Sequence, residues 1–182
     1  MIYKKTTKEL LGESVHELAQ KSGLDKITVK QIADNCGVST VTFYKYFKDK
    51  YDLISWIYNY RMEEIFADFN DGMITWEQVL ACMFSVMRED RAFYHNAYKN
   101  VVGQNGFFQS TSERLYELFT ESVKKNYSVK ITAETDFYIK YYLGGIATCF
   151  FDWFGKGCEG DIDDIAGRLC ELAPEPLVPY LF

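Results

Sequence analysis

The sequence predicts an all-α protein of about nine helices, with a three-helix domain at residues 1–50 and a larger helical domain at residues 51–182. Proline, the residue that interrupts helices most strongly, does not occur in the first 173 residues. Ser, Thr and Asp stand in helix-capping positions ahead of apolar residues at helical spacing. The alternating stretch at residues 127–132 has no second strand with which to pair.

Start signals for three short helices occur within the first domain. A Thr-x-x-Glu pattern at residues 6–9 opens the first helix, and Thr-x-x-Gln at residues 28–31 opens the second. Gly37 supplies a turn, after which Ser39 caps the third helix. The apolar residues expected to pack these helices together are Ile27, Ile32, Cys36, Val38, Phe43 and Phe47.

Six further helices are expected, at about residues 50–69, 75–90, 91–102, 110–126, 132–155 and 161–173. The Gly-Gln-Asn-Gly run at residues 103–106 is expected to separate two of them. The helix at residues 132–155 is apolar almost all round and therefore needs burial on more than one side. In the last helix, Ile165, Leu169 and Leu172 are expected to share one apolar face.

Charge is unevenly distributed along the chain, whose net charge is −6. Residues 1–50 hold nine lysines and six acidic residues, a balance of +3, whereas the remainder holds 11 basic and 20 acidic residues, a balance of −9. A basic N-terminal domain on an acidic body favours an anionic partner for that domain. On charge alone, a basic surface that is merely solvated is an equally good explanation.

Patterns typical of enzymes or metal sites do not occur in the sequence. The five cysteines are widely spaced without a Cys-x-x-Cys pair, and the two histidines have no neighbouring metal ligands. We therefore expect a protein that is not an enzyme and has no metal or other cofactor. Because no apolar run follows Met1, and the most apolar window contains Lys140 and Asp152, we expect a cytoplasmic protein that does not enter the membrane.

The second and third helices, joined by a glycine-containing turn, predict a helix-turn-helix unit. Counting about 100° per residue from Phe43 places Val41 and Lys45 on the face opposite the core, with Thr42 and Tyr44 on its flanks. A helix exposed in this way can enter the major groove of double-stranded DNA. Helix-turn-helix shapes also occur in proteins that do not bind DNA, so a helical protein-interaction scaffold is the alternative.

Residues 28–54, TVKQIADNCGVSTVTFYKYFKDKYDLI, resemble the N-terminal signature of the TetR family of bacterial transcription regulators. The shared features are the Thr-Val-x-x-Ile-Ala opening, the Cys-Gly-Val-Ser turn, and Phe-Tyr-x-Tyr-Phe-x-x-Lys followed by Asp-Leu. The resemblance implies a homodimeric repressor that binds a palindromic operator. Carried over by motif position, the DNA contacts of the family fall on Thr28, Ser39, Thr40, Val41, Thr42, Tyr44, Lys45 and Lys50.

The resemblance implies two kinds of DNA contact. Tyr44 and Lys50 would hold phosphates, whereas base edges would be read by Thr40, Val41, Thr42 and Lys45. The sequence departs from the family here, because many members carry Lys or Arg at the position of Thr40 and Gly at that of Val41. The operator sequence therefore cannot be transferred from a relative.

The resemblance also implies that DNA affinity responds to an effector bound in the larger domain. Candidate residues for a small apolar or aromatic effector are Trp56, Tyr60, Phe84, Met87, Tyr94, Phe119, Tyr138 and Tyr141. Ordinary core packing is the alternative for each of them. The segment YYLGGIATCFFDWFGKG at residues 141–157 also resembles a subgroup with regulators of dihydroxyacetone kinase genes, which can respond to a protein partner instead.

The last two predicted helices are those with which the family usually forms its dimer. The candidate interface residues are Phe150, Phe151, Trp153, Phe154, Ile165 and Leu169. Burial within one subunit is the alternative for the apolar surface of these helices. A DNA-binding protein that organises the chromosome without any effector is a further possibility.

Overall fold

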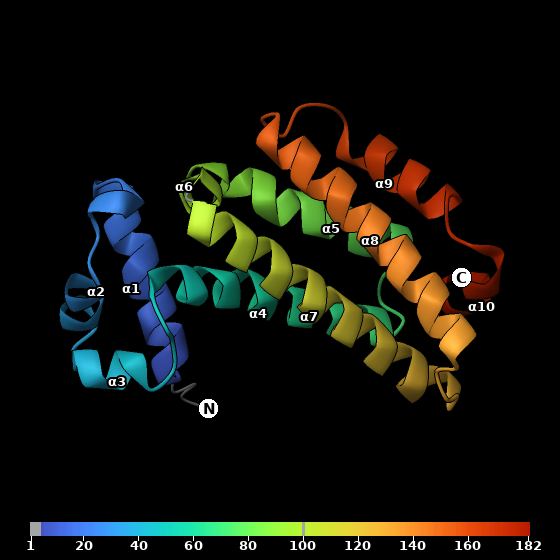
Figure 1. The fold of residues 1–182 in the computed structure, drawn as a ribbon, viewed down its shortest axis with the longest axis horizontal. Helices are drawn as coiled ribbons and strands as arrows, with labels where there is room; N and C mark the ends of the chain where they lie inside the picture. The colour runs from blue at the N-terminus through green and yellow to red at the C-terminus, as the bar shows by residue number, and fades with distance from the viewer. Residues whose placement is uncertain (1–4, 100) are drawn as a thin grey trace. The chain divides into compact units, whose positions relative to one another are not determined.

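The computed structural model describes residues 5–99 and 101–182, which form ten α-helices and two short 3₁₀ helices and contain no strand (Figure 1). The prediction of an all-α fold is confirmed. The helices are α1 (Thr7–Lys21), η1 (Leu24–Lys26), α2 (Val29–Asn35), α3 (Thr40–Tyr44), α4 (Lys50–Asn70), α5 (Trp76–Glu89), α6 (Arg91–Lys99), α7 (Val101–Tyr127), α8 (Ala133–Gly155), α9 (Ile162–Glu171), η2 (Glu175–Leu177) and α10 (Val178–Leu181).

Side-chain caps begin most of the helices where the sequence predicts them. Reciprocal capping boxes begin α1, α2 and α5, in which a threonine hydroxyl and a Glu or Gln side chain each satisfy a backbone N–H group. Single side-chain caps from Ser39, Thr132 and Asp161 begin α3, α8 and α9. These helix starts could be predicted because each depends on residues no more than three positions apart.

The predicted break at residues 103–106 is wrong, because α7 runs through it without interruption. A glycine inside a helix costs roughly 1 kcal/mol relative to alanine, but it removes no backbone hydrogen bond. Further along α7, Leu115, Phe119 and Val123 are buried at four-residue spacing, which offsets this cost. The prediction for Leu172 is also wrong: this side chain is 72% exposed, because α9 ends at Glu171.

The described chain divides into two units. The first comprises the described parts of Met1–Ile57 and Ala92–Phe107, and the second comprises Tyr58–Arg91 and Phe108–Phe182. The domain boundary predicted at residue 50 stays a prediction. None of the helices within the described residues combines the length and apolar character needed to cross a membrane.

Aromatic side chains of α5 and α8 form the core of the second unit. The ring of Phe84 lies 5.0 Å from that of Phe150 and 4.8 Å from that of Trp153, between centroids. A buried polar chain runs through the same core. The indole N–H of Trp76 donates to the Tyr142 hydroxyl over 3.0 Å, and this hydroxyl donates to the carbonyl of Leu169 over 2.8 Å. These two hydrogen bonds connect α5, α8 and α9.

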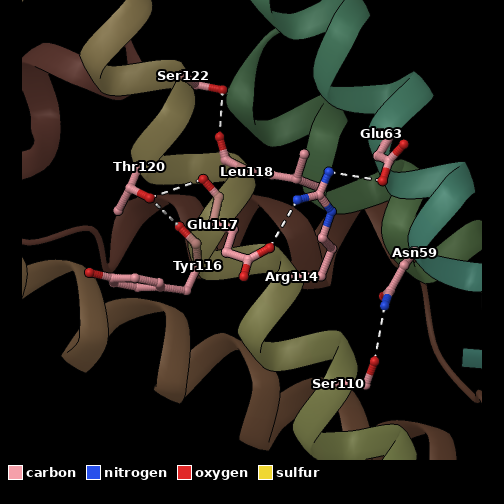
Figure 2. A network of polar contacts seen from close by, with 9 residues as sticks. All are labelled: Asn59, Glu63, Ser110, Arg114, Tyr116, Glu117, Leu118, Thr120 and Ser122. Carbon is pink, nitrogen blue, oxygen red and sulfur yellow. Dashed lines mark hydrogen bonds and ion pairs between the residues drawn. The ribbon is translucent and has the colours of Figure 1, made fainter. Parts of the chain in front are cut away.

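A second polar network joins the C-terminal part of α4 to α7 (Figure 2). Arg114 of α7 lies between Glu63 of α4 and Glu117 of α7, with nitrogen–oxygen distances of 2.8 Å and 2.9 Å. The amide of Asn59 donates to the Ser110 hydroxyl over 3.1 Å. These contacts fix the rotation of α4 about its axis relative to α7 within the second unit.

Candidate nucleic-acid interface

Helices α1, α2 and α3 enclose a small apolar core in the first unit. Ile27, Ile32, Phe43 and Phe47 are all buried, as predicted, and the rings of Phe43 and Phe47 lie 5.7 Å apart. The predictions for Cys36 and Val38 hold only in part, because both residues are half-buried. Since α2 contacts both α1 and α3, this core fixes α3 on the other two helices (Figure 1).

A buried hydroxyl connects α1 to α2. The Ser14 hydroxyl donates to the carbonyl of Ile32 over 2.7 Å, and the Asn35 amide donates to the same hydroxyl over 3.2 Å. The Asn35 amide also donates to the carboxylate of Glu17 over 3.2 Å. Because Ser14 is buried, the two hydrogen bonds of its hydroxyl hold the two helices in one register more firmly than exposed bonds would.

The turn between α2 and α3 depends on Gly37, whose φ of +74° lies in the left-handed region. Its N–H donates to the carbonyl of Asp34 over 3.2 Å, and the N–H of Val38 donates to that of Ala33 over 3.0 Å. These bonds satisfy carbonyl groups at the end of α2 and direct the chain into α3. The prediction of a helix-turn-helix with a glycine turn is confirmed.

The outward face of α3 carries the side chains that the helical geometry predicts there. Val41 is 67% exposed, Tyr44 and Lys45 are also exposed, and Phe43 on the opposite face is fully buried. Thr40 and Thr42 are half-buried. Apart from the buried Phe43, these residues form one surface that carries methyl groups, hydrogen-bonding groups and one positive charge.

The hydroxyls of Ser39 and Thr28 are engaged as helix caps. The Ser39 hydroxyl accepts from the N–H of Thr42 over 3.0 Å and shares a further hydrogen bond with the Thr42 hydroxyl. The Thr28 hydroxyl accepts from the N–H of Gln31 over 3.2 Å. A hydroxyl can accept a second hydrogen bond, so capping is compatible with a DNA contact.

Lys50 differs from the other predicted DNA contacts because its ammonium group is directed into the protein. Nζ donates to the carbonyl oxygens of Leu24, Asp25 and Ile27 over 2.8, 3.3 and 2.9 Å. Burial lowers the pKa of the Lys50 ammonium, and the charges of Asp25 and Asp49 oppose this shift. These partners lie more than 20 residues away in the sequence, where no local pattern indicates them.

The eight residues predicted to bind an effector do not line a described cavity together. Phe84, Met87, Tyr94 and Phe119 are buried, and Tyr141 is 70% exposed. The remaining three, Trp56, Tyr60 and Tyr138, are half-buried. A groove of about 450 Å³ between α7 and α8 is lined instead by other residues, among them Phe108, Ser112, Tyr116, Lys140, Leu143 and Ala147.

Five of the six residues predicted to pair two subunits are buried in their own chain: Phe150, Phe151, Trp153, Phe154 and Leu169. Ile165 is half-buried. The surface that α8 exposes carries other residues. Phe137 is 67% exposed, and Tyr141 is exposed four residues later. Gly144 and Gly145 follow, and in the described part of the chain no atom outside the local helix backbone lies within 4 Å of an added Cβ at either position.

Two protein-family models match the sequence. One, described as bacterial regulatory proteins of the tetR family, matches residues 14–55. The other, described as a transcriptional regulator C-terminal region, matches residues 74–175. Together they cover the helix-turn-helix and most of the second unit.

A curated relative, the HTH-type dhaKLM operon transcriptional activator DhaS of Lactococcus lactis subsp. lactis (strain IL1403), is 26% identical over 125 residues. The match covers 66% of this chain and spans 65% of that relative's length. The solved structure of a dihydroxyacetone kinase operon activator DhaS is similar, with a TM-score of 0.59, 19% identity and coverage of 92% of this chain and 93% of that one.

The TetR family repressor AlkX from Dietzia sp. strain DQ12-45-1b has a similar fold, with a TM-score of 0.61, 15% identity and coverage of 94% of this chain and 96% of that one. Thermus thermophilus FadR, solved with lauroyl-CoA, has a TM-score of 0.55, 16% identity and coverage of 91% and 92%. At these identities the likeness concerns the fold. The family models carry the assignment, and the chain belongs to the TetR family of bacterial regulatory proteins.

Proposed function

We propose that this transcription regulator acts in the cytoplasm as a homodimer on a palindromic DNA operator. Family membership already makes the chain a DNA-binding transcription regulator and not an enzyme. The exposed face of α3 is the observation that carries the proposal. Phe43 anchors this helix in the core, so that Val41, Tyr44 and Lys45 are held outward on a rigid support.

Each side chain on the outward face of α3 and its C-terminal end suits one kind of DNA contact. The methyl groups of Val41 and Thr40 can contact thymine methyls in the major groove, and the Lys45 ammonium can donate to guanine acceptors. The Tyr44 hydroxyl can donate to a phosphate oxygen, which would fix the orientation of the helix on the duplex. Thr40 stands where many members of the family have Lys or Arg. Because threonine has no long basic side chain, we expect the operator to be read mainly by methyl contacts near the start of α3.

The exposed face of α8 supports the formation of a dimer. Gly144 and Gly145 weaken a helix by roughly 1 kcal/mol each relative to alanine, yet among the described residues no neighbour requires their small size. Glycines in a helix allow the backbone of a second helix to approach closely. Phe137 and Tyr141 would lose exposed apolar area when a second copy covers this face.

Dimer geometry links this surface to operator recognition. Two recognition helices that read a palindrome must lie one DNA turn apart, roughly 34–36 Å. An effector that binds one dimer geometry more tightly would change DNA affinity by its differential affinity for the two geometries. An effector that binds both geometries equally would leave DNA affinity unchanged.

The groove between α7 and α8 is the candidate position for an effector within the second unit. Phe108, Leu143 and Ala147 contribute apolar lining to the groove, and Glu113 and Lys140 contribute charged lining. This lining suits a ligand with an apolar body and a polar end. The same groove could receive an apolar side chain of a protein partner. Ala147→Trp would fill the groove and should abolish the change in DNA affinity that either the small effector or the protein partner causes.

The sign of regulation is a separate choice. We propose repression, in which the dimer obstructs transcription at its operator. The name of the curated relative DhaS, a transcriptional activator, favours activation as the second candidate. A reporter gene placed behind the operator decides between them: deleting the regulator raises reporter output under repression and lowers it under activation.

Selection of binding sites from a random pool of duplex DNA tests the proposed function. Enrichment of a palindrome whose half-sites are one helical turn apart is the expected result. Enrichment of no sequence at near-physiological salt would contradict sequence-specific binding and favour the protein-interaction scaffold. Uniform retention of all duplexes would instead favour a protein that organises the chromosome.

A further inference from the structure

Lys50, the first residue of α4, directs its ammonium group at the backbone that precedes α2. The group donates to three carbonyl oxygens, those of Leu24, Asp25 and Ile27. An ammonium group has three N–H donors, so these carbonyls occupy all of them. A direct hydrogen bond from Lys50 to a DNA phosphate would therefore require one of the internal bonds to break.

The third of these carbonyls belongs to the peptide that leads into α2. The carbonyl of Ile27 and the N–H of Thr28 form one planar peptide unit. The N–H of Thr28 donates to the side-chain oxygen of Gln31 over 2.9 Å, while Lys50 binds the carbonyl over 2.9 Å. The peptide plane is thus held from both sides, and its orientation sets the direction in which α2 begins.

Burial around the ammonium group makes this arrangement specific. The side chains of Leu24 and Ile27 are buried, and Lys50 itself is half-buried with its Nζ 5.4 Å from the centre of the Tyr51 ring. Carbonyl groups shielded from water by such neighbours need a donor from the protein. Lys50 supplies this donor to the Ile27 carbonyl from 23 residues away in the sequence. The Leu24 carbonyl also accepts from the N–H of Ile27 over 3.1 Å, and the bond to Asp25 is exposed, so the bond to Ile27 is the decisive one.

We propose that Lys50 is a positioning residue for DNA binding, which holds residues 24–28 so that α2 and, through it, α3 are presented in one orientation. This inference rests on the proposed DNA-binding function. It differs from the role that the family resemblance implies for Lys50, which is a direct phosphate contact.

Two substitutions in the full-length chain separate the two roles. Lys50→Met keeps most of the apolar stem but removes the donors and the charge, whereas Lys50→Arg keeps the charge. A planar guanidinium cannot direct three donors from one nitrogen at three carbonyls. The affinity of each variant for an enriched operator duplex is measured over a series of salt concentrations, with Lys48→Ala as the control for losing an exposed lysine.

The positioning role predicts that both Lys50 variants bind the operator about tenfold more weakly than the parent at every salt concentration. The slope of log affinity against log salt concentration should stay the same as that of the parent. A direct phosphate contact predicts a slope that is shallower by about 0.9 per subunit for Lys50→Met. It also predicts that Lys50→Arg restores the parent's affinity. Either of these two results, or parent-like binding by Lys50→Met, would overturn the proposal.

Two further measurements distinguish positioning from a loss of folded protein. Stoichiometric titration with the operator gives the fraction of each variant that is active. A purely structural defect would lower this fraction and leave the affinity of the active molecules unchanged. That result would also overturn the proposal. Amide hydrogen exchange of the free protein is expected to be faster over residues 24–31 in both variants. Exchange at the parent's rate over these residues would refute the positioning role of Lys50. This test needs no DNA, so it remains valid if the parent binds no duplex, a result that would refute the proposed function instead.

Discussion

Val41 and Phe43 lie two residues apart in α3, and their side chains have opposite environments: Val41 is 67% exposed and Phe43 is fully buried. The helical turn places Phe43 in the core of the first unit, beside Phe47, and leaves Val41 in solvent. Under the proposed function, stability and sequence recognition depend on different residues of the same short helix. Substitutions at the two positions should have separable effects.

Phe43→Ala should destabilise the protein by about 3–5 kcal/mol, because it removes a buried ring and leaves a cavity. Val41→Ala should change the free energy of unfolding by less than about 0.5 kcal/mol, because the side chain is exposed. Val41→Ala should nevertheless change which base pairs are preferred at one operator position. Urea unfolding and site selection measure the two effects, and an unchanged site preference for Val41→Ala would contradict the assigned face.

Ser14→Ala should destabilise the first unit by about 1–3 kcal/mol, since it leaves the carbonyl of Ile32 with only the weak thiol donor of Cys36. Ser22→Ala is the matched control, because the Ser22 hydroxyl also donates to a backbone carbonyl, that of Leu18, but at an exposed position. The control should cost less than about 0.5 kcal/mol. Equal losses in urea unfolding would show that the Ser14 bond contributes nothing specific to the packing of α1 on α2.

The Tyr142 hydroxyl predicts a loss of stability in alkaline solution. Burial raises its pKa from 10.0 to about 12, so the folded protein holds this proton more tightly than the unfolded chain does. The stabilisation is complete below pH 10 and is lost as the pH rises through about 12, and two pKa units correspond to about 3 kcal/mol. The free energy of unfolding of the parent should therefore fall more steeply over this interval than that of Tyr142→Phe.

Tyr44→Phe, which removes an exposed hydroxyl, is the control for this comparison. Its unfolding free energy should follow that of the parent between pH 10 and 12. At neutral pH, Tyr142→Phe should be less stable than the parent by about 1–2 kcal/mol, because it disrupts the hydrogen bonds to Trp76 and Leu169. A parent and a Tyr142→Phe variant with parallel pH profiles would be evidence against the buried, neutral hydroxyl.

Helix starts and the core of the helix-turn-helix could be predicted from the sequence because their determinants are local. The cap of α2 needs only Thr28 and Gln31, and the burial of Phe43 follows from helical spacing. The path of α7 could not be predicted in the same way. The cost of its glycines is outweighed by packing against helices that are distant in the sequence.

The sites in the second unit were harder to predict for a related reason. In α8, aromatic residues occur on almost every side, so hydrophobic periodicity does not distinguish the face packed in the chain's own core from the exposed face. Phe150 is buried, whereas Phe137 is exposed. The groove between α7 and α8 and the carbonyl partners of Lys50 both arise from tertiary contacts that no local motif encodes.

Gly145→Leu tests the proposed pairing surface of α8. A Cβ added at this exposed position lies within 4 Å of no neighbouring atom of the described residues outside its own helix, so the Gly145→Leu subunit should fold, but its leucine should keep a second helix at a distance. Gly106→Leu is the matched control, because Gly106 is also an exposed helical glycine with open space around its Cβ position. Light scattering should show two chains per particle for the parent and the control, and one for Gly145→Leu.

Dimeric Gly145→Leu particles would contradict the assigned surface. A monomeric parent would contradict the homodimer itself. If the assignment is right, Gly145→Leu should also bind a single half-site about as well as the full palindrome, because the second recognition helix is no longer linked to the first.

Sequence-specific recognition of DNA is the central claim, and the ratio of two dissociation constants tests it most directly. The parent is titrated at near-physiological salt with an enriched operator duplex and with a duplex of the same composition in scrambled order. Binding to the operator should be at least about a thousandfold tighter, as is typical of specific regulators. Equal affinities for the two duplexes would contradict the claim.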